Sequence, residues 1–177
     1  MYIADLDLCH YHNGPLDADS WRVPLRAVGY LEHPNPFAQG TTPPGFLDKL
    51  RNQIARVYPN YPHYQFRGVH ECSLCAAERR EGPNHGGWSQ ENAFFPSEQA
   101  VFVCPGGIVH YVEAHRYRPP DAFIDAVLAS ADYGSPAFYA DLERANGGTK
   151  TPLVSYAETL AEHAAWVERF KAQRGIS

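Results

Sequence analysis

The sequence predicts an α+β domain in which a small antiparallel sheet of about four strands packs against about five helices. Two observations lead to this class. Stretches with apolar residues at alternate positions, which are typical of half-buried strands, come before stretches with apolar residues every three or four positions, which are typical of helices and are concentrated in the C-terminal half. In addition, fifteen prolines and fourteen glycines divide the chain into short, sharply terminated elements.

Four stretches alternate apolar and polar residues and are expected to form the strands. In the first, Val23 and Leu25 share one face, and Pro24 favours an edge position or a strand start. The last two are separated by Pro96-Ser97, which is typical of a hairpin turn. The predicted strands are residues 21–31, 63–69, 88–95 and 99–103.

Five stretches carry the helical spacing. The first follows the start signal Pro43-Pro44 and is expected to stop before Pro59, since a residue that precedes proline avoids the helical conformation. Residues 76–87 are charged and then glycine-rich, so they are expected to form a loop or a short helical turn. The predicted helices are residues 43–58, 108–115, 121–131, 136–147 and a last one that begins at Pro152.

The chain length fits a single domain over residues 1–147 with one C-terminal helix, residues 148–177, appended to it. In that helix Leu153, Leu160 and Val167 belong to an apolar stripe with four-three spacing. Such a stripe is typical of a docking face, either onto its own domain, onto a protein partner or onto a second copy in a homodimer.

Composition excludes several classes of function. A formal net charge of −5 argues against binding to nucleic acid or to an anionic membrane surface. No apolar stretch approaches the roughly 20 residues of a membrane-spanning helix, and the N-terminus lacks the regions of a signal peptide. We therefore expect a cytoplasmic protein, in which the four cysteines are metal ligands or buried thiols rather than disulfides.

The run from Gly68 to Cys75 contains three metal-ligand residues. Cys72 and Cys75 have the spacing of a zinc knuckle, and His70 shares a face with Cys72 if the segment is extended. Nitrogen and sulfur ligands of this kind favour Zn²⁺ over Mg²⁺ or Ca²⁺. A redox pair or two core thiols are the competing interpretations, although the polar segment after Cys75 does not resemble the helix of a thioredoxin-like motif.

The second half of the site is expected from the segment between His110 and His115. The two histidines are five positions apart, or about 140° around a helix, so they do not share a face unless the helix has ended by His115. We favour His110 as the ligand and keep His115 in reserve. Cys104 is either a further sulfur ligand or a buried thiol. The candidate metal ligands are thus His70, Cys72, Cys75, His110 and His115.

Two functions follow from the ligand set. The first is a structural Zn²⁺ with four protein ligands, in a protein with an accessory or protein-interaction role. The alternative is a zinc-dependent hydrolase with an open metal position lined by His115, Glu113 and Tyr111. A third interpretation is a polar ligand pocket without metal. The sequence contains no metalloprotease or zinc-deaminase motif.

Two patterns in the chain resemble a family of small uncharacterised bacterial proteins. The resemblance covers roughly residues 1–130 and implies a bacterial origin and a shared metal or active-site constellation, with no known activity. The first pattern is the opening, Val28-Gly29-Tyr30-Leu31 followed by His33, Pro36-Phe37 and Gly40. The second is Gly68-x-His70-x-Cys72-x-x-Cys75, then His110-Tyr111, His115, Tyr117, Pro119-Pro120, Phe123-Ile124 and Ala126.

Overall fold

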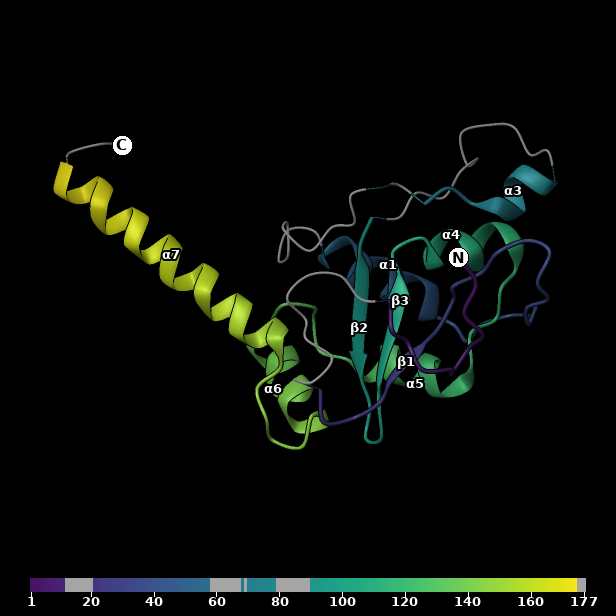
Figure 1. Ribbon diagram of the computed structural model, residues 1–177, viewed down its shortest axis with the longest axis horizontal. Helices are drawn as coiled ribbons and strands as arrows, with labels where there is room; N and C mark the ends of the chain where they lie inside the picture. The colour runs from purple at the N-terminus through teal and green to yellow at the C-terminus, as the bar shows by residue number, and fades with distance from the viewer. Residues whose placement is uncertain (12–20, 58–67, 69, 79–89, 175–177) are drawn as a thin grey trace.

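The computed structural model describes residues 1–11, 21–57, 68, 70–78 and 90–174. Within these residues the chain has an α+β fold with a three-stranded sheet and six helices (Figure 1). The sheet order is β1 (Leu25–Ala27), β3 (Val101–Pro105) and β2 (Asn92–Pro96). β1 is parallel to β3 and β2 is antiparallel to it, so the prediction of a wholly antiparallel sheet is wrong for the first pair.

The predicted strand over residues 63–69 lies, apart from Gly68, outside the described residues, so a fourth strand stays a prediction. The strand predicted over residues 21–31 is limited to Leu25–Ala27, and at its C-terminal end Gly29 takes the left-handed conformation, with φ 76°, which interrupts the extended backbone. Its N–H donates a hydrogen bond of 2.9 Å to Oδ1 of Asp5. The carboxylate of Asp5 also accepts from the hydroxyl of Tyr117, at 2.8 Å, so the N-terminal segment is fixed by residues far along the chain.

The helices begin and end close to the positions that their sequence signals indicate. The helix predicted over residues 108–115 has those bounds, whereas the first helix begins after its prolines and ends earlier than expected. A short helix forms directly after Cys72, where the sequence favoured a loop or helical turn only from residue 76. The bounds are α1 (Phe46–Ala55), α3 (Ser73–Ala77), α4 (Ile108–His115), α5 (Asp121–Ala129), α6 (Pro136–Ala145) and α7 (Pro152–Arg174).

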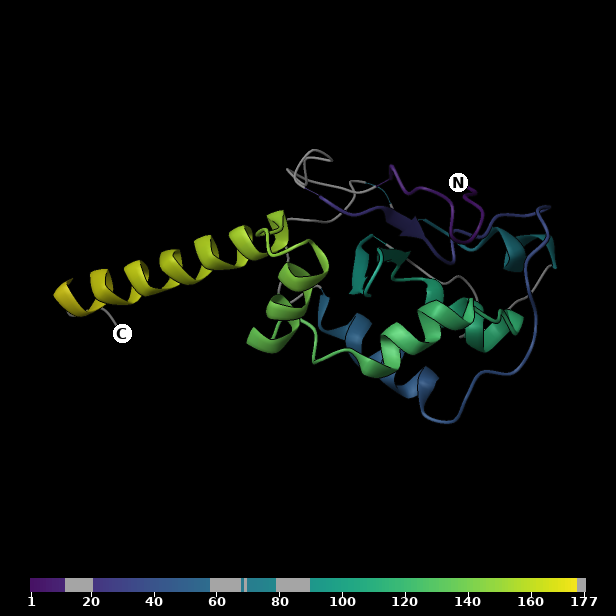
Figure 2. The ribbon, with the colours of Figure 1, turned by 90° about the horizontal axis from the view of Figure 1, so that it is seen from below.

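The core lies between the sheet and the helices α1, α4 and α5, which pack on one side of it (Figure 2). Phe123 of α5 makes edge-to-face contacts with Phe95 of β2 and Phe102 of β3. Gln53 of α1 is 1 % exposed, and its amide joins α1 to the end of α5. Its Nε2 donates to the hydroxyl of Ser130 at 2.6 Å and its Oε1 accepts from the N–H of Tyr133 at 2.8 Å.

α7 begins in the body of the molecule and then extends away from it (Figure 1). Leu153, in its first turn, is 1 % exposed and belongs to the core, whereas Trp166 further along is 54 % exposed. Among the described residues, no helix has both the length and the apolar content needed to cross a membrane.

Candidate metal centre

The first half of the site is built on the N-terminus of α3. Cys72 is the N-cap residue of this helix, and its Sγ accepts a hydrogen bond of 3.4 Å from the backbone N–H of Cys75. The turn therefore points both sulfurs to the same side. Cys72 is 3 % exposed and Cys75 is 1 % exposed, so both thiols lie inside the protein. A pair of sulfurs presented by one tight turn is the arrangement expected of a knuckle.

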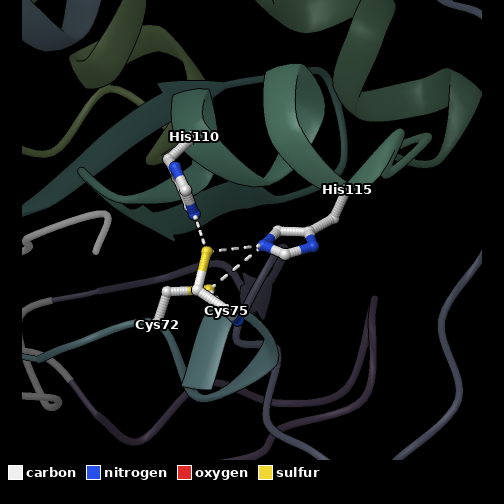
Figure 3. Close-up of side chains that lie close together, drawn as sticks. All are labelled: Cys72, Cys75, His110 and His115. Atoms are coloured by element: carbon white, nitrogen blue, oxygen red, sulfur yellow. Dashed lines mark hydrogen bonds between the residues drawn. The ribbon is translucent and has the colours of Figure 1, made fainter. Parts of the chain in front are cut away.

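The second half of the site comes from α4, at the opposite side of the sulfurs (Figure 3). Nε2 of His110 lies 3.2 Å from Sγ of Cys75. Nε2 of His115 lies 3.3 Å from Sγ of Cys75 and 3.3 Å from Sγ of Cys72. The side chains of two segments more than 30 positions apart thus converge on one point.

The sequence favoured His110 and kept His115 in reserve, and the structure brings both imidazoles to the sulfurs. On a helix of 3.6 residues per turn the two residues lie about 140° apart. Their Nε2 atoms nevertheless reach the same sulfur, at 3.2 Å for His110 and 3.3 Å for His115 from Sγ of Cys75. His115 is also the last residue of α4, because Arg116 takes the left-handed conformation with φ 56°.

The four ligand atoms, one from each of Cys72, Cys75, His110 and His115, all lie within 4.8 Å of one another. A tetrahedral zinc site with Zn–S of about 2.3 Å and Zn–N of about 2.05 Å has S···N edges of about 3.6 Å. The observed S···N distances of 3.2 and 3.3 Å are slightly shorter than these edges. The cluster is therefore of the size that could hold a metal ion, and it provides four protein ligands.

Burial favours the protonated form of one thiol of the site. It raises the pKa of Cys72 to about 11, with a smaller raising contribution from the neighbouring Cys75. Burial also raises the pKa of Tyr111, a residue of α4 that lies near both thiols. Without a cation the Cys72 thiol is therefore neutral at pH 7, and a bound metal must displace its proton, because thiolate is the form that ligates.

Two further side chains of the α3 segment, Glu78 and Ser73, contact residues outside that segment. Nδ1 of His115 lies 3.5 Å from Oε1 of Glu78, the C-cap residue of α3. Sequence reasoning missed Glu78, since a glutamate in a charged stretch carries no signal of this role. Ser73 of α3 accepts a hydrogen bond of 3.0 Å from the backbone N–H of His33, so α3 is also tied to the loop that follows β1.

His70 and Cys104 lie outside this four-residue cluster. His70 lines a separate cavity of about 70 Å³ together with Tyr30 and Tyr111. Cys104 lies in β3 opposite Ala93, is fully buried, and has a thiol pKa that burial raises. Its surroundings are those of a buried thiol in the sheet.

Glu113, which the hydrolase alternative requires at the metal, lies on another side of α4. Its carboxylate is exposed and pairs with the guanidinium of Arg51 on α1. Tyr111, in contrast, is 3 % exposed and lies beside the ring of His115, with 6.4 Å between the ring centroids. An acid or base for hydrolysis from Glu113 is therefore not available at this site.

Comparison with known proteins gives one family match. The family model described as "Domain of unknown function (DUF7919)" matches residues 1–128, well over half of the chain. The matched region contains all four clustered residues and extends into α5. No curated protein and no solved structure matches the chain.

Proposed function

We propose that this chain, which belongs to the DUF7919 family of domains of unknown function, holds one structural Zn²⁺ between Cys72, Cys75, His110 and His115. The ion would fasten α3 to α4 and so fix the segment around residue 72 against the core. The observation that carries the proposal is the convergence of two sulfurs and two imidazole nitrogens within 4.8 Å of one another.

The donor set supports zinc as the metal. Two anionic thiolates and two neutral imidazoles form a soft ligand set that matches Zn²⁺, whereas Mg²⁺ and Ca²⁺ take oxygen ligands. With two thiolates, the ion and its ligands would have no net charge. A neutral complex lowers the cost of placing the ion among side chains as buried as Cys72 and Cys75.

Ligand number supports a structural role. Structural zinc sites are closed by four protein ligands, and catalytic sites keep one position for water. Three of the four residues here are buried, with His110 half-buried. The hydrolase alternative would need one of the four to leave the ion, and its expected base, Glu113, pairs with Arg51 instead. We therefore propose that the metal has a structural rather than a catalytic role.

Metal content tests the proposal directly. Zinc in the purified protein should be one equivalent by elemental analysis, and Cys75→Ser should remove it because a serine hydroxyl is a poor ligand for Zn²⁺ at neutral pH. Cys104→Ala is the matched control, since it removes a buried thiol outside the cluster and should keep the full equivalent. A full equivalent in Cys75→Ser would contradict the proposal.

Chelation separates the structural role from the catalytic one. Metal binding energy is folding energy at a structural site, so removal of zinc should lower the melting temperature by more than about 10 °C. A melting temperature that does not change after proven metal loss would favour the hydrolase.

We further propose an accessory role in the bacterial cytoplasm, with α7 as the contact to a protein partner or to a second copy. The four free cysteines fit a reducing compartment. The support for the contact is the apolar side chain of Trp166, which is 54 % exposed on a helix that extends from the body. Light scattering of the full chain and of a Trp166→Glu variant tests whether α7 contacts a second copy. The full chain should then be a dimer, and the charge introduced by Trp166→Glu should dissociate it.

A further inference from the structure

The carboxylate of Glu78 lies beside the ring of His115, a contact that the four ligands of the proposed zinc site do not by themselves require. Nε2 of His115 faces both sulfurs at 3.3 Å, and Nδ1, on the other side of the ring, lies 3.5 Å from Oε1 of Glu78. The imidazole therefore lies between the thiols and a carboxylate. Its side chain is 1 % exposed, whereas that of Glu78 is 45 % exposed.

We propose that Glu78 is a positioning residue for the metal centre: its carboxylate, 3.5 Å from Nδ1 of His115, would accept the Nδ1–H when the ion is bound and so direct the lone pair of Nε2 at the ion between the two sulfurs. This inference rests on the proposed zinc function. A neutral imidazole carries one proton, and a carboxylate near Nδ1 can only accept, so the proton belongs on Nδ1 and Nε2 is left free to ligate.

Glu78 is held at the end of the same short helix that carries the two cysteines. Glu78 is the C-cap residue of α3, and its backbone N–H donates to the carbonyl of Leu74 at 3.0 Å. The same short helix therefore presents Cys72 and Cys75 from its first turn and the Glu78 carboxylate from its end. A helix of five residues has little propensity of its own to form, so its orientation depends on tertiary contacts, which include these three to α4 and the hydrogen bond between Ser73 and His33.

A carboxylate that accepts from the second nitrogen of a metal-bound histidine raises the basicity of the ligand and fixes the ring. Loss of such a partner typically weakens metal binding by about 10- to 100-fold. Because the Glu78 side chain is 45 % exposed, its removal opens no cavity in the core, and the fold should survive the substitution although Nδ1 of His115 loses this acceptor.

Zinc affinity, measured by competition with a chromophoric chelator, tests the inference with three variants of the full chain. Glu78→Ala should weaken zinc binding by about 10- to 100-fold, with the stoichiometry unchanged. Glu78→Gln should lose less, since its amide oxygen still accepts from Nδ1–H. Glu113→Gln is the matched control: it neutralises an exposed carboxylate that faces Arg51, and it should stay within about twofold of the wild type.

A second measurement uses the metal-free protein. Two-bond ¹H–¹⁵N correlation spectra of the imidazole should show the His115 proton on Nδ1 in the wild type, and a smaller fraction of that tautomer in Glu78→Ala. Equal zinc affinity in Glu78→Ala and Glu113→Gln would overturn the inference, and so would a wild-type His115 with its proton on Nε2. If the wild type binds no zinc, the proposed function fails, and the tautomer alone decides the role of Glu78.

Discussion

Gly29→Ala tests how the loop after β1 fixes the start of α4. Gly29 has φ 76°, and a Cβ added there would lie 2.8 Å from Cδ1 and 2.9 Å from Cγ1 of Ile108, the first residue of α4. The left-handed conformation costs a residue other than glycine about 1–2 kcal/mol. Displacement of the fully buried Ile108 adds about 1–3 kcal/mol of overpacking. We expect the free energy of unfolding to fall by about 2–5 kcal/mol.

Gly148→Ala is the matched control for that variant. Gly148 has φ 75°, almost the value of Gly29, but its added Cβ would meet no heavy atom within 4 Å. Gly148→Ala should lose only the stability that the left-handed backbone conformation costs. The free energies of unfolding of the two zinc-loaded variants, measured in urea, should therefore differ by about 1–3 kcal/mol. A difference under about 0.5 kcal/mol would refute the argument that Ile108 is fixed by close contact with Gly29. Because α4 carries His110 and His115, only Gly29→Ala should also weaken zinc binding.

Three further outcomes are expected. Gln53→Leu should lower the free energy of unfolding by about 1–3 kcal/mol in urea titration, because it removes the acceptor of the buried N–H of Tyr133; a loss under about 0.5 kcal/mol would contradict this. Burial raises the pKa of Cys72 to about 11, so zinc must displace that proton, and its association constant should rise by at least about tenfold per pH unit between about pH 7 and 8.5; chelator competition that gives a constant value would count against a protonated thiol. Removal of residues 158–177 should leave the melting temperature unchanged, whereas removal of residues 149–177 should lower it, because the second deletion also takes away the buried leucine in the first turn of α7; equal melting temperatures would show that this leucine does not contribute.

The parts of the fold that follow from local signals could be predicted from the sequence. α4 has the predicted bounds because glycines precede it and prolines follow soon after. The pairing of Cys72 and Cys75 with the His110 segment also followed from spacing and residue type. The bounds of α4 depend on a few neighbouring residues, whose backbone preferences are known, and the choice of ligand residues depends on their type and spacing.

The remaining features depend on contacts between distant segments. Alternating residues are the same in parallel and antiparallel strands, so the sequence could not show that β1 runs parallel to β3. His115 joins the cluster together with His110, since both imidazoles reach Sγ of Cys75, whereas residue spacing alone left the two histidines as alternatives. Glu78 looks like any other exposed glutamate until α3 brings it to the ring of His115.

The double contact of Asp5 has a consequence for the order in which the molecule assembles. Its carboxylate accepts from the N–H of Gly29 and from the hydroxyl of Tyr117. During translation, which releases the N-terminal residues first, Asp5 can meet Gly29 early, whereas its contact with Tyr117 can form only after Tyr117 has left the ribosome. By then the cysteines and histidines of the cluster have also been synthesised, so this contact and the metal centre become possible at almost the same stage of synthesis.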